Sequence, residues 1–308
     1  MECCLYLCGA TASGKSAVAV ELAARIGGEI VNADAYQLYR GLEVCTAKPS
    51  PKERAAVPHH LLDVLDPSEA CDAQRFREMA LPVIASIVAR GRWPLVVGGS
   101  GLYMKALTHG LASLPKGDED LRKRLALMAP EERVGELLRL DPDAAQNVPM
   151  KNDRYVSRAL EICLLTGRPQ SELRQEWLAH EPRFMGVAIS RERDDLYLRI
   201  NRRVEHMVEH GLVPEIAGLG ELSATAAKAI GVREIRAHLH GECSLAEAVA
   251  AIQQASRRYA KRQVTWIKRE RRFQTICLPP ESTASVAADQ ILELYPCLRL
   301  PPPPAPSL

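Results

Sequence analysis

Short apolar runs alternate with amphipathic stretches through the first hundred residues of the chain. Three runs have the length and composition of buried strands, at residues 4–8, 29–33 and 94–98. Between them the sequence predicts helices over residues 15–26 and 72–90, and a shorter helix near 36–40. Strands that alternate with helices favour a parallel, doubly wound sheet. We therefore expect an α/β core.

The pattern changes near residue 116. Residues 116–182 are rich in Arg, Leu and Glu without a strand signal, which indicates a helical insertion. One more strand is expected at 184–189, followed by an almost wholly helical part with helices at 194–210, 214–221, 228–239 and 245–272. The end of the chain, 301–308, is typical of a disordered or polyproline tail. The expected parts are a first core segment (1–115), the insertion (116–182), a helical second core segment (183–280) and a partly disordered tail (281–308).

Composition sets limits on the function. A chain of 308 residues that is 47% hydrophobic can bury an ample core, and its net charge of +2 is too small to indicate nucleic-acid binding by itself. The nine cysteines form no C-x-x-C pair and no histidines cluster at zinc-ligand spacing, so we expect reduced thiols. With no recognisable signal peptide and no apolar run of about 18 residues, we expect a cytoplasmic protein without a membrane span.

Residues 9–16 read GATASGKS, a complete G-x-x-x-x-G-K-[ST] phosphate loop between an expected strand and an expected helix. Successive backbone N–H groups and the helix N-terminus of such a loop hold phosphate oxygens. Lys15 reaches the outer phosphate, and the hydroxyl of Ser16 can hold Mg²⁺. This context disfavours the alternative of a simple glycine turn. The phosphate-binding candidates are Gly9, Ala10, Thr11, Ala12, Ser13, Gly14, Lys15 and Ser16.

A second candidate site lies at the ends of the other strands. The strand at 94–98 continues into a glycine turn with Ser100 and carries no acidic residue at its end, which weakens an ATP-hydrolysis interpretation. Asp34 instead follows the strand at 29–33, at the sheet edge where ligands bind in open α/β folds. It can act as a general base, a Mg²⁺ ligand or a cap for the following turn. Ser100 either shapes a turn or points its hydroxyl into the site.

Residues 256–273 read SRRYAKRQVTWIKRERRF, in which eight Lys and Arg side chains oppose only Glu270. Tyr259, Trp266 and Phe273 recur every seven residues and would share one helical face. A solvated helix anchored by these aromatic residues is the plainer interpretation. Cations crowded on one helix repel one another unless an anion binds, however, and a polynucleotide backbone fits that requirement.

Together these segments resemble the tRNA dimethylallyltransferases, also called tRNA isopentenyltransferases. The resemblance covers about residues 5–275. It rests on motifs in the family's order, namely GATASGKS, NADAYQLYRGLEVCTAKP, HHLLDVLDP, GGSGLY, SRALEI, AIG and RRYAKRQVTWIKR. The D-x-x-Q turn with TAKP and the R-x-Y-A-K-R-Q-x-T-W helix are the most specific of these.

The resemblance implies a core like that of the P-loop NTPases and a transferase activity. The family transfers a dimethylallyl group from dimethylallyl diphosphate to the exocyclic N6 amine of adenosine at tRNA position 37, beside the anticodon. The phosphate loop would then hold a diphosphate with Mg²⁺. Asp34 matches the general base, Ser100 matches a contact to the target nucleotide, and Arg122 falls where an Arg lies near the diphosphate. The implied partners of this cytoplasmic enzyme, expected to be a monomer, are dimethylallyl diphosphate and the anticodon stem-loop of tRNA.

The resemblance also implies a set of tRNA contacts. Ala35 and Val232 stand where the family commonly has Ser and Tyr. The alternative function, a small-molecule or nucleotide kinase, would use the same loop and leave the basic helix without a role. The candidate contacts are Asp34, Ala35, Tyr36, Gln37, Ser100, Arg122, Arg154, Tyr155, Val156, Ser157, Arg158, Gly231, Arg233, Ser256, Arg257, Arg258, Tyr259, Ala260, Lys261, Arg262 and Gln263.

Overall fold

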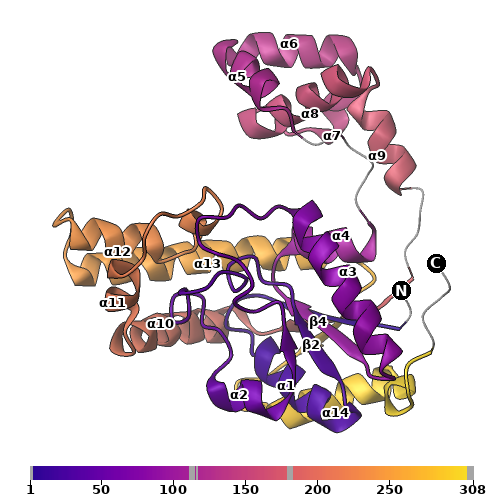
Figure 1. The fold of residues 1–308 in the computed structure, drawn as a ribbon, viewed down its shortest axis with the longest axis vertical. Coiled ribbons are helices and arrows are strands. Elements are labelled where there is room, and N and C mark those ends of the chain that lie inside the picture. The colour runs from indigo at the N-terminus through magenta and orange to yellow at the C-terminus, as the bar shows by residue number, and fades with distance from the viewer. Residues whose placement is uncertain (1–2, 111–114, 116, 179–182, 304–308) are drawn as a thin grey trace. The chain divides into compact units, whose positions relative to one another are not determined.

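The computed structural model describes residues 3–110, 115, 117–178 and 183–303. The chain divides into two compact units (Figure 1). Residues Met1–Thr108 and Arg183–Leu308 form the core unit, and His109–Pro182 form the helical unit. The helical unit thus begins somewhat before residue 116, where the sequence pattern changes.

The core unit is built on a six-stranded sheet in the order β3-β2-β4-β1-β5-β6, and every neighbouring pair is parallel. In the register, Leu7 lies between Val97 and Val187. The expected parallel α/β core is confirmed. Its strands are β1 (Leu5–Gly9), β2 (Glu29–Asn32), β3 (His59–His60), β4 (Pro94–Gly98), β5 (Met185–Ser190) and β6 (Gln274–Cys277).

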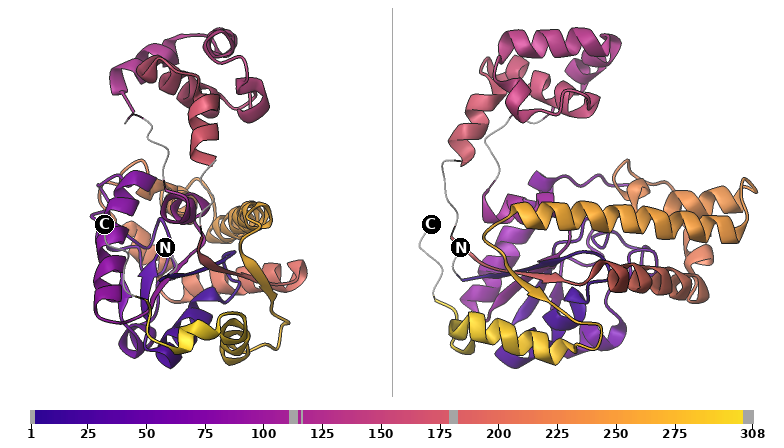
Figure 2. Two further views of the ribbon diagram at one scale, coloured as in Figure 1. Left: turned by 90° about the vertical axis from the view of Figure 1, so that its right-hand side faces the viewer. Right: turned by 180° about the vertical axis from the view of Figure 1, so that it is seen from behind.

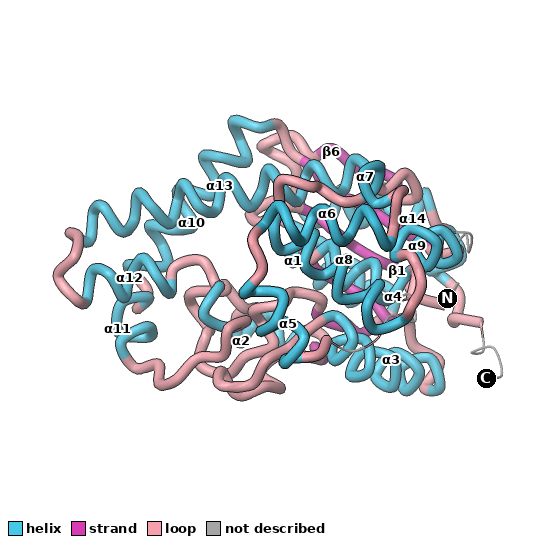
Figure 3. The backbone as a smooth tube through the Cα atoms, turned by 90° about the horizontal axis from the view of Figure 1, so that it is seen from above, coloured by secondary structure: helices cyan, strands magenta, loops and turns pink. Residues whose placement is uncertain are grey.

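Helices cover both faces of this sheet. Leu5 and Leu7 point to the face covered by α1 and α14, whereas the intervening Tyr6 points to the other face and meets Phe184 edge-on. Figures 2 and 3 show α10, α11 and α12 grouped at one end of the core unit, and α13 runs from that end to α4. The helices are α1 (Lys15–Ile26), α2 (Pro51–Ala56), α3 (Ala73–Ala89), α4 (Gly101–Thr108), α10 (Arg193–Glu209), α11 (Leu212–Ala217), α12 (Val232–Leu239), α13 (Leu245–Arg269) and α14 (Ala284–Leu294), with short 3₁₀ turns η1 (Ala226–Lys228) and η2 (Pro296–Arg299).

The helical unit has a hydrophobic core of its own. Leu121, Leu137 and Leu160 pack there from three different helices, and Asp118 caps α5 by accepting from the N–H of Leu121 at 2.7 Å. Val156 belongs to the same core and is 1% exposed, and its candidacy as an RNA contact stays a prediction. The helices are α5 (Glu119–Leu127), α6 (Pro130–Leu140), α7 (Ala144–Asn147), α8 (Asp153–Thr166) and α9 (Gln170–Leu178).

The end of the core unit differs from the expectation. Residues 281–308 were expected to form a tail, yet α14 lies there and buries Ala288 and Ile291 against α1. Trp93 Nε1 donates to the carbonyl of Leu300 at 2.7 Å, which ties the segment beyond α14 to the sheet. The rest of the proline-rich end, 304–308, lies outside the described residues. The amphipathic pattern of α14 was not recognised because the proline-rich segment 301–308 follows closely.

Two local expectations were also wrong, and some short strands were not predicted. Residues 36–40 form turns rather than a helix, because their backbone pairs with the 63–65 segment instead. The basic helix ends at Arg269, so Phe273 lies beyond α13. Strands β3 and β6 were not predicted, because β3 has only two residues and β6 has four, of which only Ile276 is buried.

Candidate active site

Four strand ends bring the site together at one edge of the sheet. Because all the strands run parallel, their carboxyl ends lie side by side. The phosphate loop follows β1, Asp34 follows β2, Ser100 follows β4 and Arg191 follows β5. A pocket of the core unit at this edge is lined by residues that include Thr11, Lys15, Ser16, Asn32, Asp34, Tyr36, Gln37, Thr46, Arg203, Ser256, Tyr259 and Gln263.

Hydrogen bonds from two arginine side chains hold the phosphate loop. Gly14 has a φ of 94°, a left-handed conformation that glycine adopts without strain, directly before α1 begins at Lys15. Arg191 Nε donates to the carbonyl of Ser13 at 2.9 Å, and Arg199 Nε donates to the carbonyl of Ala12 at 3.0 Å. These bonds fix the carbonyls of Ala12 and Ser13 and so hold the conformation of the loop.

The charges at the pocket leave it ready for an anion. Loss of surrounding water lowers the pKa of Lys15 to about 8, and the negative charge of Asp34 opposes this shift. Desolvation likewise lowers the pKa of Arg203, again opposed by Asp34. Two desolvated cations therefore share one carboxylate. A diphosphate would restore the missing negative charge.

Asp34 is held with one oxygen free. Its Oδ1 accepts from the N–H of Tyr36 at 3.0 Å, and its own N–H donates to Oδ1 of Asn32 at 3.1 Å. The next N–H, that of Ala35, donates to the hydroxyl of Ser100 at 3.2 Å. Asp34 thus closes a turn, but no helix follows for it to cap. Its Oδ2 accepts no hydrogen bond from the described residues, so this oxygen can take a proton.

Helix α13 also lines the pocket. Ser256 and Tyr259 line the pocket, and burial together with the charge of Asp34 raises the pKa of Tyr259, so its hydroxyl stays protonated. Gln263 is 5% exposed and binds two loops through its amide. Ala260 is fully buried. Gln263 thus positions the two loops and Ala260 packs in the core, while their candidacy as RNA contacts stays a prediction.

The other RNA-contact candidates on the core unit differ in how far their side chains are exposed to solvent. Arg258, Lys261 and Arg262 are exposed along α13. Arg257 instead turns to Asn201, to which its Nη1 donates at 2.6 Å. Arg233 is exposed at the start of α12, whereas the preceding Gly231 is buried.

The helical unit holds the remaining candidates. Arg122 and Arg158 both pair with the buried Glu161, at 2.9 Å and 2.5 Å. Arg154 and Tyr155 are exposed at the start of α8, and Ser157 is half-buried. The role of Arg122 near a diphosphate stays a prediction.

The arginines that follow β5 were not among the residues predicted for the site. Arg199 and Arg203 stand one helical turn apart on α10, and Arg191 precedes the helix, so all three reach the same side. Their spacing and their place after a strand end were the available signals. The expected strand at 184–189 was not followed to its carboxyl end, where these residues lie.

The comparisons with known proteins agree with this geometry. A family model described as IPP transferase matches residues 37–270, and one described as isopentenyl transferase matches residues 3–64. The chain is 48% identical over 274 residues to the tRNA dimethylallyltransferase of Geobacter metallireducens, covering 85% of this chain and 88% of the relative. It is 43% identical over 289 residues to that of Akkermansia muciniphila, covering 94% and 98%.

Two solved structures share the fold. The full-length tRNA isopentenylpyrophosphate transferase of Bacillus halodurans has a TM-score of 0.71 and 35% identity, covering 97% of each chain. A eukaryotic dimethylallyltransferase acting on tRNA has a TM-score of 0.78 and 27% identity, covering 89% of this chain and 73% of that one. The family expected from the motifs is confirmed, and the chain belongs to the tRNA dimethylallyltransferases, or tRNA isopentenyltransferases.

Proposed function

We propose that the chain transfers a dimethylallyl group from dimethylallyl diphosphate to the exocyclic N6 amine of adenosine at tRNA position 37, beside the anticodon, and releases diphosphate. One observation carries the proposal. The free oxygen of Asp34 and the phosphate loop with Lys15 line the same pocket, so a base and a leaving-group site face each other.

The chemistry needs both groups. An adenine amine is a poor nucleophile because its lone pair is delocalised into the ring, and proton removal by Asp34 during attack contributes typically about 10²–10⁴-fold. A new N–C bond forms and the allylic C–O bond breaks, and the electron pair of the C–O bond leaves with the diphosphate. Lys15, Arg203 and the loop N–H groups accept that negative charge. The target base must leave its stack to reach the pocket.

Magnesium fits this site as a partner of the diphosphate. Among the described residues no three His, Cys, Asp or Glu side chains gather to form a metal cage. Ser16 nonetheless presents a hydroxyl in the pocket beside Lys15, and Mg²⁺ commonly binds through one protein oxygen, substrate phosphates and water. We propose that Ser16 holds the ion, which when bound would neutralise diphosphate charge.

The interface with RNA belongs to the same proposal. The exposed cations Arg258, Lys261 and Arg262 would contact the anticodon stem-loop along α13, and Arg233 would extend that surface. A kinase would leave these cations without a partner.

No helix of the described residues is long and apolar enough to cross a membrane. We propose that the enzyme acts in the cytoplasm, where its tRNA substrate is found, and as a monomer.

Asp34→Asn tests the proposal, because the amide keeps an oxygen for the Tyr36 N–H and loses the base. We expect single-turnover transfer to fall by about 10²–10⁴-fold while affinity for a stem-loop RNA stays unchanged. The assay detects the dimethylallyl mass on adenosine, with dimethylallyl diphosphate and Mg²⁺ but no ATP. Asp66→Asn is the matched control, because Asp66 closes a similar turn onto the N–H of Ser68 at 3.0 Å. A rate for Asp34→Asn within threefold of wild type would remove the base from the mechanism.

A further inference from the structure

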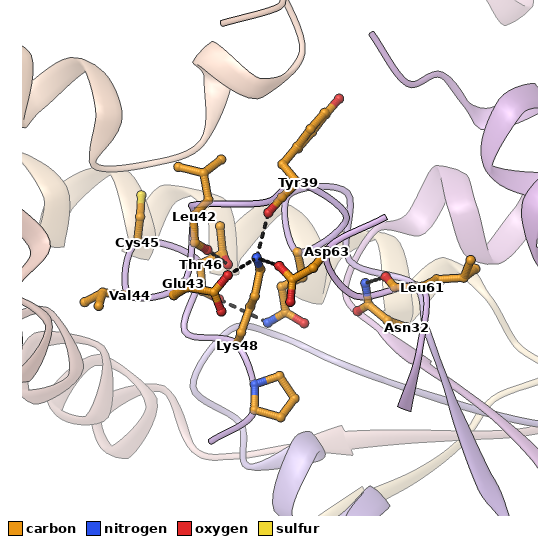
Figure 4. Close-up of polar contacts among 12 residues, drawn as sticks. Asn32, Tyr39, Leu42, Glu43, Val44, Cys45, Thr46, Lys48, Leu61 and Asp63 are labelled. Atoms are coloured by element: carbon orange, nitrogen blue, oxygen red, sulfur yellow. Dashed lines mark hydrogen bonds and ion pairs between the residues drawn. The ribbon is translucent and has the colours of Figure 1, made fainter. Parts of the chain in front are cut away.

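A network of four charged side chains lies beside the pocket and has no part in the chemistry above. Lys48 is at its centre, with a side chain that is 1% exposed. Its Nζ donates to the carbonyl of Tyr39 at 2.6 Å, to Glu43 at 2.7 Å and to Asp63 (Figure 4). Arg54 completes the network by pairing with Asp63 at 2.8 Å and with Glu43 at 3.0 Å. Two cations and two carboxylates balance one another, so the network itself recruits no ion.

The network joins two loops that both reach Gln37. The N–H of Asp63 donates to the backbone carbonyl of Gln37 at 3.3 Å. On the other side, Lys48 directly follows Thr46 and Ala47, and the side chain of Gln37 donates from Nε2 to their carbonyls at 3.1 Å and 3.2 Å. The backbone and the amide of Gln37 are therefore held by segments that Lys48 ties together.

The 42–48 loop has few alternatives to this conformation. Glu215 on α11 accepts from the N–H groups of Val44 and Cys45 at 2.6 Å and 2.8 Å. Arg203 adds a bond to the carbonyl of Thr46 at 3.2 Å. Ala47 has a φ of 45°, which a residue with a side chain rarely adopts unless its surroundings impose it.

This arrangement fixes which end of the Gln37 amide faces the pocket. Carbonyl oxygens accept only, so the end of the amide against Thr46 and Ala47 must be the NH₂ group, and both of its protons are used there. The remaining atom, Oε1, accepts no hydrogen bond from the described residues, and Gln37 lines the pocket. The pocket thus receives an acceptor at this position, whereas an unconstrained glutamine would offer either end.

An acceptor pairs with an exocyclic amine and repels an exocyclic carbonyl oxygen. We propose that Lys48 is a positioning residue that, through the Thr46 and Ala47 carbonyls, holds the Gln37 amide oxygen toward the pocket and so selects an amino-bearing base over a carbonyl-bearing one. This inference rests on the proposed function, since it concerns the base that the same site accepts.

The test compares two competing stem-loop RNAs that differ only at the target position, one with adenosine and one with inosine. Inosine presents an oxygen in place of the amine, so it can inhibit but cannot accept the prenyl group. For the wild type we expect the adenosine RNA to bind roughly tenfold tighter or more. Failure of the wild type to prenylate the adenosine RNA at all would be a failure of the proposed function, and it is visible before any variant is made.

Lys48→Met should lower this adenosine-to-inosine ratio by about fivefold. A purely structural lysine would reduce the folded fraction and so the amount of active enzyme, leaving the affinities for both RNAs and their ratio as they were. Lys105→Met is the matched control, because Lys105 also pairs with a carboxylate, Glu270, at 2.7 Å, and it does not line the pocket. We expect its ratio to equal that of the wild type.

Two further variants keep the test decisive if Lys48→Met does not fold. Asp63→Asn retains an oxygen for Lys48 but removes the charge, and Gln37→Leu removes the acceptor itself. Each should lower the ratio. A ratio within twofold of wild type for folded Gln37→Leu would overturn the role of the amide, and the same result for folded Asp63→Asn and Lys48→Met would overturn the role of Lys48.

Discussion

The backbone N–H of Thr11 donates a hydrogen bond of 2.8 Å to the side-chain Oε1 of Gln263, 252 residues further along the chain. The Nε2 of the same amide donates to the carbonyl of Gly99 at 2.9 Å. Gln263 is 5% exposed, so both bonds are shielded from water and strengthened by that shielding. One side chain of α13 therefore fixes the phosphate loop against the turn that carries Ser100.

Gln263→Leu should destabilise the protein and loosen the site. The substitution leaves the Thr11 N–H and the Gly99 carbonyl without partners, which costs about 1–3 kcal/mol for each buried group. Urea unfolding measures the free energy, and a raised KM for dimethylallyl diphosphate reports the loosened loop. Gln253→Leu on the same helix is the control, because the hydrogen bonds of the Gln253 side-chain amide are longer, at 3.3 Å and 3.5 Å. Equal unfolding free energies for the two variants would contradict the bridging role.

Gly101→Ala tests how closely α13 approaches the same turn. A Cβ on Gly101 would lie 2.6 Å from the Trp266 ring, too close for either group to stay in place. We expect a loss of about 1–3 kcal/mol in unfolding free energy and slower transfer, because the turn holds Ser100. Gly135→Ala in α6 is the control, since a Cβ there meets nothing within 4 Å and should stabilise the helix by about 0.5–1 kcal/mol.

The features that could be predicted from the sequence are those that depend on neighbouring residues in the chain. The helix at 15–26 was found with its bounds, because Gly14 and Gly27 adopt left-handed conformations at its two ends. Asp34 was placed at the sheet edge, because a residue that directly follows a parallel strand must lie there. The free oxygen of Asp34 and the turn it closes required the structure.

The features that the sequence did not reveal depend on distant partners. The motif around Gln263 suggested an RNA contact, and only the approach of α13 to the phosphate loop shows that its amide hydrogen-bonds to Thr11 and Gly99. Arg199 was not singled out in the sequence, because its partner, the carbonyl of Ala12, lies 187 residues earlier in the chain. Lys48 belongs to a recognised motif, yet its burial follows from pairing with Asp63, fifteen residues away.

Lys15→Met should stabilise the free protein while abolishing use of the diphosphate. The pKa of Lys15 is lowered to about 8 from the ordinary lysine value of 10.5, so at pH 7 the folded chain holds this proton less tightly than the unfolded chain does. Removing the charge should raise the unfolding free energy at pH 7 by about 2–3 kcal/mol. The gain should shrink between pH 8 and pH 10.5, where folding already releases the proton.

Denaturation at pH 7 and pH 10 measures this difference. Lys123→Met is the control, because that side chain is 70% exposed and should show no gain at either pH. A Lys15→Met variant that is less stable than wild type at pH 7 would show that the charge of Lys15 does not destabilise the folded protein.

The KM for dimethylallyl diphosphate should rise with pH above about 8 in the wild type. The neutral amine of Lys15 cannot pair with phosphate, so binding then requires uptake of a proton, and the affinity falls by up to about tenfold for each pH unit. The affinity for RNA alone should stay level over the same range. A KM that is flat from pH 7 to 9.5 would separate Lys15 from the diphosphate.

Replacing both Arg258 and Arg262 with Ala should weaken RNA binding and flatten its salt dependence. Both side chains are exposed on α13, and each phosphate contact that is lost lowers the slope of log affinity against log salt by about 0.7–0.9. Fluorescence anisotropy of a labelled stem-loop at several salt concentrations measures that slope. Arg25→Ala is the control, since Arg25 pairs with Glu21 and Asp289 away from α13 and should leave the slope unchanged. If the double variant kept the wild-type slope, α13 would have to be removed from the RNA interface, and its exposed charge would need another anion.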